Sequence, residues 1–164
     1  MKSAGKIHLV LCCIAALLLA GLPARAAQPG QGGADRPLEM VKAIYAPYLG
    51  KAPMTASWLD QLAPIAAPRL AALLERERSC QAQYLKACKY LFDVIANGEK
   101  PDVRGLQLQL AAPSKETMEI AAMFTNNGAP ARLVYQFRKM GGKWLLEDIR
   151  SMEGETWSLV KLLQ

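Results

Sequence analysis

Histidine is almost absent from this sequence of 164 residues, because its single copy, His8, lies just before a long apolar run near the N-terminus. The rest of the chain therefore lacks the side chain needed for a Ser-His-Asp or Cys-His nucleophile, or for a histidine-ligated zinc or copper ion. Glycine-rich phosphate loops and calcium-binding loops are also missing from the sequence. We accordingly expect neither a metal nor a cofactor.

Cysteine is scarce as well. Cys12 and Cys13 lie inside the apolar run, so only Cys80 and Cys88 remain in the rest of the chain. Two cysteines cannot complete a structural zinc site, and their C-x7-C spacing differs from the C-x-x-C of thiol oxidoreductases. Two cysteines in an oxidising compartment usually pair, so we predict a structural Cys80–Cys88 disulfide, with free thiols or an intermolecular bridge as alternatives. A disulfide needs Cα atoms within about 4.4–6.8 Å, so the chain must turn back between them.

The N-terminus has the pattern of a secretory signal peptide. Lys2 and Lys6 precede the apolar run Leu9–Leu22, and the small residues of Ala24-Arg25-Ala26 predict cleavage after Ala26. A membrane anchor is the weaker interpretation, because the run would span about 21 Å of a hydrocarbon core roughly 30 Å thick. We expect signal peptide 1–26 to be removed and the protein to be periplasmic or secreted, with no membrane span.

The net charge becomes small once this leader is set aside. Without Lys2, Lys6 and Arg25, the basic residues fall from 20 to 17 against 14 acidic ones, which leaves a net charge of about +3. No stripe of lysine and arginine is interleaved with aromatic residues. We therefore expect no nucleic-acid partner.

The remaining chain divides by its periodicity. Residues 27–34, "AQPGQGGA", predict a disordered lead-in, and residues 35–164 predict one domain. "DRPLEMVKAIYAPYLG" predicts a helix that begins at Asp35 and bends or ends at Pro47. "TASWLDQLAPIAAPRLAALLERER" predicts a short helix that begins at Ser57 and a longer one from Pro68 to Arg78.

The second half alternates with a period of two, which is typical of strands. "VRGLQLQLAA" and the stretches around Ile120, Tyr135 and Leu146 each alternate. Asn127-Gly128 and Gly141-Gly142 are hairpin turn signals. We predict a meander of three or four antiparallel strands and a short closing helix in "ETWSLVKLLQ". Helices followed by strands indicate an α+β fold with the helices on one sheet face.

Three stretches of this pattern resemble a known family. "VKAIYAPYLG" resembles an opening "V…FY..YL" helix, "LFDVIANGEKPD" an "fDPfxxgqD" loop, and "GGKWLLEDI" a closing "g.WrIddI" hairpin. The family comprises small exported bacterial proteins with a domain of unknown function in the NTF2-like superfamily. The family's loop has proline after the aspartate, where Val94 stands here. The resemblance implies a cystatin-like cone of helices packed into a curved antiparallel sheet, with a cavity between them, and no particular activity.

Such a cavity would be bounded by the first helix and the concave sheet face. The large side chains expected near it are Tyr45, Tyr48, Trp58, Tyr135 and Trp144, and core packing is the alternative role for them.

Three aspartates complete the set of candidate residues. Asp148 shares strand parity with Trp144, so it is a weak candidate for a buried general base beside a tyrosine. It could equally lie at the rim or pair with an arginine, and the opposite parity could face inward. The resemblance implies that Asp93 and Asp102 cap turns and hold the loop against the sheet, with a ligand or cation contact as the alternative.

The sequence thus favours a non-catalytic periplasmic domain that binds a small apolar ligand or a protein partner. One alternative is an isomerase or lyase that uses Asp148 and a tyrosine. Another is an assembly or inhibitor protein that acts through its surface, for example as a homodimer across the outer sheet face.

Overall fold

Helices form the first half of the described chain, and strands form most of the second. The computed structural model describes residues 35–50, 56–83, 88 and 92–164, so the predicted signal peptide and lead-in lie outside the described residues. The described residues belong to one compact unit. Its elements are α1 (Asp35–Leu49), α2 (Trp58–Leu62), the 3-10 helix η1 (Ala63–Ile65), α3 (Pro68–Gln83), β1 (Val103–Ala111), β2 (Thr117–Asn126), β3 (Ala129–Met140), β4 (Lys143–Ser151), β5 (Trp157–Ser158) and α4 (Leu159–Leu162).

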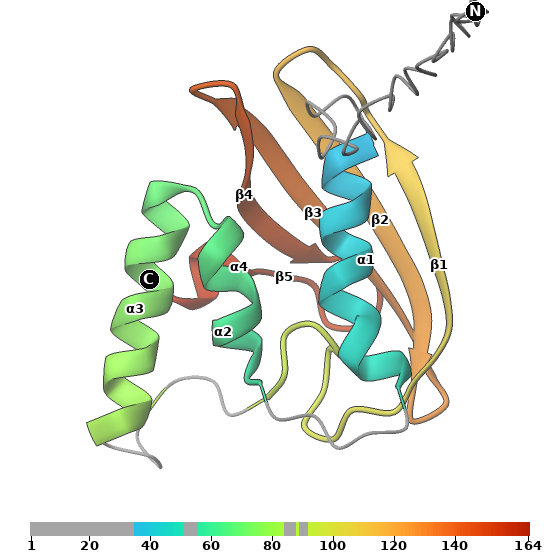
Figure 1. Cartoon of the computed structure of the whole chain (residues 1–164). Helices are drawn as coiled ribbons and strands as arrows, with labels where there is room; N and C mark the ends of the chain where they lie inside the picture. Colours follow the sequence, from blue (N-terminus) through green and yellow to red (C-terminus); the bar gives the residue numbers. More distant parts are fainter. Residues whose placement is uncertain (1–34, 51–55, 84–87, 89–91) are drawn as a thin grey trace, which may run out of the picture. The chain divides into compact units, whose positions relative to one another are not determined.

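The strands form one antiparallel sheet in the order β1-β2-β3-β4-β5, so each strand pairs with its neighbour in sequence (Figure 1). Asn127 and Gly128 have φ angles of 50° and 81° and connect β2 to β3. Gly141 and Gly142, with φ angles of 56° and 79°, connect β3 to β4. Two successive residues with positive φ suit the right-handed twist of a hairpin. The predicted α+β class and antiparallel meander are confirmed, but the sheet has five strands where three or four were predicted.

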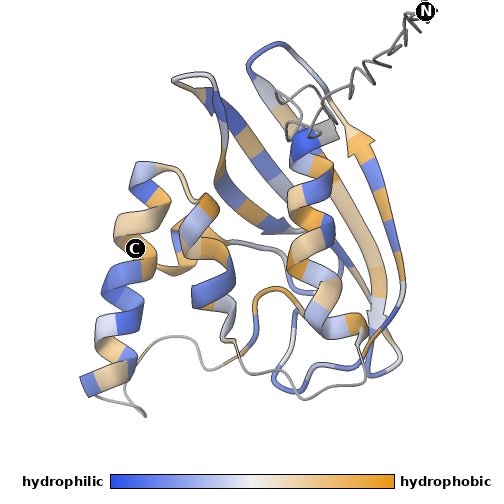
Figure 2. Ribbon diagram, viewed as in Figure 1, coloured by the Kyte–Doolittle hydropathy of each residue, from blue (hydrophilic) through white to orange (hydrophobic). Residues whose placement is uncertain are grey.

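The core lies between the helices and one face of the sheet. Helix α1 contacts β1 and β2, whereas α3 and α4 contact β4. Figure 1 shows α1 in front of the sheet, with α2 and α3 to one side. The apolar stripe of α1 buries Val41, Ile44 and Tyr45, and the Tyr45 ring lies 5.5 Å from that of Phe124 on β2. Apolar and polar residues alternate along β1 in Figure 2, as expected of a strand with one face toward the core.

Two helices extend beyond their predicted ends. Ser57 caps α2 as expected, because its side chain accepts a hydrogen bond from a backbone N–H of the first turn. However, α1 continues past Pro47 to Leu49, and α3 continues past Arg78 to Gln83. A proline in the last turn removes only one helical hydrogen bond, so α1 can complete that turn before it ends.

A bulge in β4 changes which side chains face the core. Phe137 pairs with Leu146, but Gln136 pairs with Asp148, so β4 carries one more residue than β3 at this point. Leu146 is buried before the bulge, and Ile149 is buried after it. An added residue moves the following side chains to the other face. The sequence allowed either alternate set of β4 residues to face the core. The set that contains Trp144 and Leu146 faces the core before the bulge, and the set that contains Ile149 does so after it.

Candidate functional site

A disulfide connects the last turn of α3 to the chain that follows it. Cys80 and Cys88 are bonded, with their Cα atoms 5.7 Å apart. The predicted pairing is therefore confirmed. Helix α3 continues past Cys80 to Gln83, so the bond to Cys88 requires the reversal between the two cysteines that the sequence predicts.

Asp93 organises this loop. Its Oδ1 accepts hydrogen bonds from the backbone N–H groups of Ile95 at 2.8 Å and Ala96 at 3.0 Å. Its Oδ2 accepts a hydrogen bond from the Tyr48 hydroxyl of α1 at 2.6 Å. The backbone of Asp93 also exchanges two hydrogen bonds with Gly98. The Asp93 side chain thus closes the turn and attaches it to the first helix.

Asp102 acts mainly through its backbone. Its N–H donates to Oδ1 of Asn126 at 2.7 Å, and its carbonyl accepts from the N–H of Asn127 at 3.3 Å. Its exposed carboxylate accepts from Nε of Arg104 at 3.0 Å. The backbone hydrogen bonds of Asp102 therefore connect the start of β1 to the β2–β3 turn.

The five aromatic residues expected at a pocket lie in or against the packed core. Tyr45 and Tyr135 are fully buried, Trp58 and Trp144 are buried, and Tyr48 is half-buried. The Tyr135 hydroxyl donates to the Tyr45 hydroxyl at 3.0 Å, and Tyr45 donates to the carbonyl of Ile95 at 3.2 Å. These hydrogen bonds join β3, α1 and the loop of residues 92–98, the Asp93 loop, inside the core.

The pKa values of three tyrosines are raised. These residues, Tyr45, Tyr48 and Tyr135, form the tyrosine cluster. Burial raises the pKa of Tyr45 well above its usual value, and the neighbouring Tyr135 adds to that rise. Burial and then the Asp93 carboxylate raise the pKa of Tyr48. Burial also raises the pKa of Tyr135, although its hydrogen bond with Tyr45 lowers it in part. The phenols are therefore neutral hydrogen-bonding groups at ordinary pH, since desolvation disfavours the phenolate.

Asp148 joins the end of β4 to the C-terminal helix. Its Oδ1 accepts from the N–H groups of Ile149 at 2.9 Å and Val160 at 3.0 Å. Its Oδ2 accepts from the Ser158 hydroxyl at 2.7 Å. All of these partners belong to the scaffold, and the carboxylate lies at the bulge of β4.

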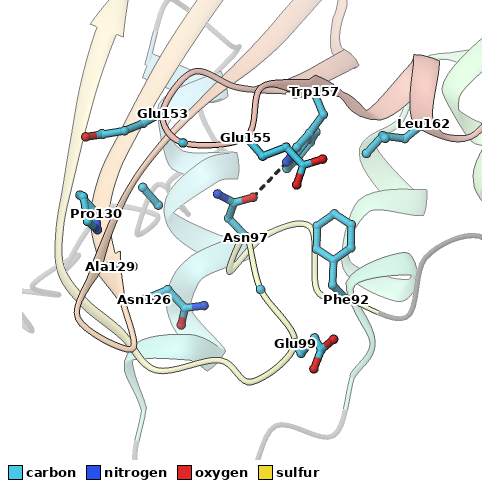
Figure 3. A pocket seen from close by; sticks show the side chains of 13 residues that line it. Phe92, Asn97, Glu99, Asn126, Ala129, Pro130, Glu153, Glu155, Trp157 and Leu162 are labelled. Atoms are coloured by element: carbon cyan, nitrogen blue, oxygen red, sulfur yellow. Dashed lines mark hydrogen bonds between the residues drawn. The ribbon is translucent and has the colours of Figure 1, made fainter.

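A cavity of about 400 Å³ lies elsewhere, where several connections meet. Its walls come from the loop after Phe92, the β2–β3 turn, the β4–β5 connection and α4 (Figure 3). The lining includes Phe92, Asn97, Glu99, Asn126, Glu155 and Trp157. None of the five aromatic residues predicted from the sequence lines it. The expected space between α1 and the sheet is instead filled by the tyrosine cluster and its apolar neighbours.

Two aromatic rings form one wall of this cavity. Phe92 and Trp157 lie edge to face, with ring centroids 6.0 Å apart and an interplanar angle of 67°. Nε1 of Trp157 donates to Oδ1 of Asn97 at 3.0 Å, which fixes the indole against the loop (Figure 3). Asn97 has a φ angle of 54°, a left-handed conformation that asparagine adopts more readily than most residues. The loop conformation therefore helps to orient the aromatic wall.

Asn126 supplies an amide donor to the same cavity. Only 8% of this residue is exposed, and its Oδ1 accepts from the N–H of Asp102. This hydrogen bond fixes the amide so that Nδ2 points toward the middle of the cavity in Figure 3. Nδ2 has no acceptor among the described residues. A Cβ atom at Gly98 would lie 2.5 Å from Nδ2, so the glycine leaves the space that this amide occupies.

No helix in the described part of the chain is long and apolar enough to cross a membrane. No group of three or more histidine, cysteine, aspartate or glutamate side chains in the described ranges is placed to hold a metal ion.

Neither a protein-family model nor a curated protein matches this sequence. Among solved structures, the chain is similar to a phospholipid-binding protein from Ralstonia solanacearum in complex with a phospholipid. The TM-score is 0.34 and the sequence identity 16%, over 75% of this chain and 58% of that chain. The match therefore spans less than two thirds of that protein, and a similarity this distant assigns no function here.

Proposed function

We propose that this domain binds a small ligand in the 400 Å³ cavity and does not catalyse a reaction on it. The observation that carries the proposal is the Nδ2 donor of Asn126, which lines the cavity, is fixed in orientation and has no acceptor among the described residues. An acceptor atom on a ligand could receive a hydrogen bond from this donor, which is the role that a few placed polar groups have in a binding pocket.

The isomerase or lyase alternative has less support. A general base must lie within hydrogen-bonding reach of the proton that it removes. Asp148 and Tyr135 do not line the cavity, and both are engaged in hydrogen bonds with the scaffold. We therefore propose structural rather than catalytic roles for Asp148 and Tyr135.

Assembly through the outer sheet face also has less support. On that face Oε1 of Glu119 accepts from Nη2 of Arg150 at 2.7 Å and from Nε2 of Gln136 at 2.8 Å. These hydrogen bonds pair three polar side chains of that face with one another. A homodimer interface there would have to bury this polar network.

Two features support placing this binding domain among exported NTF2-like proteins. Helices that precede an antiparallel meander and pack on one of its faces are the arrangement implied by the family resemblance. The Cys80–Cys88 disulfide is typical of proteins that fold in an oxidising compartment. A periplasmic location is therefore part of the proposal.

The test is native mass spectrometry of the full chain, purified in its disulfide-bonded form from the periplasm. We expect a retained small molecule in the wild type. Ala129→Trp would fill the cavity and abolish retention, because Ala129 is exposed within the lining. Ala72→Trp, on the exposed surface of α3, is the matched control and should retain the ligand. Equal retention by both variants would place the ligand elsewhere and overturn the proposal.

A further inference from the structure

The charge of the cavity contrasts with that of the chain. Among the 13 lining residues, three are glutamates, Glu99, Glu153 and Glu155, and none is lysine, arginine or histidine. The chain without the predicted signal peptide, in contrast, has a net charge of about +3, from 17 basic and 14 acidic residues. None of these three carboxylates makes an ion pair with another described residue. The electrostatic field of the cavity therefore favours a cation.

The carboxylates are arranged for a cation larger than a metal ion. No three acidic, histidine or cysteine side chains among the described residues come close enough to share a metal. In the view of Figure 3, the side chains of Glu155 and Glu99 are seen on opposite sides of Phe92. A metal ion requires converging ligands at short distances. An organic cation can instead be stabilised by carboxylates spread around it.

The aromatic wall is suited to the same kind of ligand. An indole or phenyl face attracts ammonium groups through its quadrupole, and pairs of aromatic residues recognise quaternary ammonium ions in this way. Trp157 is fixed by its hydrogen bond to Asn97, so its ring is already oriented in the absence of a ligand. The Nδ2 donor of Asn126 is independently placed to donate a hydrogen bond to an acceptor atom on the ligand.

We propose that the cavity selects an organic ammonium ion that also carries a hydroxyl or carbonyl oxygen. The ammonium group would lie against Phe92 and Trp157, between Glu99 and Glu155, and the oxygen would accept from Nδ2 of Asn126. This inference rests on the proposed function, since it names the ligand class of the same cavity. It replaces a purely apolar ligand, for which the three carboxylates would have no role.

The first test compares choline with 3,3-dimethylbutan-1-ol, which has the same shape and hydroxyl group but no charge. Each is titrated into the full chain while tryptophan fluorescence is recorded, because Trp157 is the tryptophan that lines the cavity. We expect choline to bind about tenfold more tightly, from the cation–π and carboxylate interactions together. Trp157→Phe should remove most of the signal, which would assign it to this cavity.

Variants then test the role of the carboxylates. Glu99→Gln combined with Glu155→Gln should weaken choline binding about three- to tenfold and leave the neutral probe unchanged. Glu116→Gln removes one exposed carboxylate in the β1–β2 connection, outside the cavity, and should have no effect. Higher ionic strength should weaken choline binding to the wild type, because these carboxylates are exposed to solvent.

Equal affinity for the two probes, or no binding of choline, would overturn the ammonium inference. If the wild type nevertheless retains a molecule that Ala129→Trp does not, the proposed binding function stands and only the ligand class is wrong. If the wild type retains nothing and binds neither probe, both proposals fail.

The ammonium could belong to a free solute or to a lipid headgroup. Sedimentation with phosphatidylcholine vesicles, with and without free choline, distinguishes these sources. Co-sedimentation that choline prevents would assign the headgroup. Choline binding without co-sedimentation would assign a free cation, and both results would support the ammonium site.

Discussion

The hydroxyl of Tyr135 on β3 donates a 3.0 Å hydrogen bond to the hydroxyl of Tyr45 on α1, and both residues are fully buried. The Tyr45 hydroxyl in turn donates to the carbonyl of Ile95 in the Asp93 loop. Because this loop also carries Asn97 and Gly98, the core and the cavity share one structural element. The stability of the core and the shape of the cavity are therefore coupled.

Tyr45→Phe should destabilise the fold more than Tyr135→Phe. The first change leaves both the Tyr135 hydroxyl and the Ile95 carbonyl without their partner, whereas the second removes only one donor. We expect a loss of about 2–3 kcal/mol in the free energy of unfolding for Tyr45→Phe and about 1 kcal/mol for Tyr135→Phe. Urea unfolding of the two variants, which lose the same single atom, measures the difference. The reverse order would contradict this interpretation of the hydrogen bonds.

Stability should fall as the pH rises above about 10. The pKa values of Tyr45, Tyr48 and Tyr135 are raised in the folded protein, so the folded state keeps protons that the unfolded state releases near the ordinary tyrosine pKa of about 10. The stabilisation is thus complete below pH 10 and is lost progressively above it. Thermal unfolding between pH 8 and about 11, together with phenolate absorbance, tests the expectation. Phenolate absorbance from these three residues before unfolding would refute it.

Asp148→Asn should reduce stability while leaving ligand retention intact in the folded fraction. In the wild type, three donors point at the Asp148 carboxylate. An asparagine keeps one oxygen acceptor but places an NH₂ group, itself a donor, against some of these donors. We expect a loss of about 1–3 kcal/mol in the free energy of unfolding. Glu147→Gln, next in sequence, affects only a partly exposed ion pair with Arg138 and should cost less than about 1 kcal/mol. Unchanged stability for Asp148→Asn would show that its hydrogen bonds are not structural.

Gly98→Ala should displace the Asn126 amide and weaken ligand retention. The backbone of Gly98 suits an alanine, but the new Cβ would lie 2.5 Å from Nδ2 of Asn126. Overpacking of this kind costs about 1–3 kcal/mol. The double variant Gly98→Ala/Asn126→Ala removes the displaced amide, so in a double-mutant cycle the two changes should be strongly non-additive. Additive effects would mean that the two side chains do not compete for this space.

Much of the fold could be predicted because its signals are local. Asn127-Gly128 and Gly141-Gly142 identify two hairpin turns from four residues, and the scarcity of cysteine leaves one pairing for Cys80. The bulge of β4 has no such local signal. Its extra residue depends on how β4 pairs with β3, so the orientation of Asp148 could not be decided from alternation along one strand.

The cavity was harder to predict for a related reason. Phe92, Asn126 and Trp157 lie in three connections far apart in sequence, and only the tertiary fold brings them together. The tyrosines of α1 and β3 were the more visible candidates, yet their apolar surroundings place them in the core. Trp157 lies in the stretch predicted as a closing helix, where nothing in the sequence distinguishes it from a packing residue.

The Asp93 loop contacts the core and also lines the cavity, and this has a consequence for hydrogen exchange. The amide protons of Ile95 and Ala96 are held by the Asp93 carboxylate, so they exchange with solvent only when the loop opens. A molecule bound against Asn97 and Gly98 would stabilise the closed loop and slow that exchange. Occupancy of the cavity should therefore be detectable at two backbone amides, those of Ile95 and Ala96, that lie outside its lining.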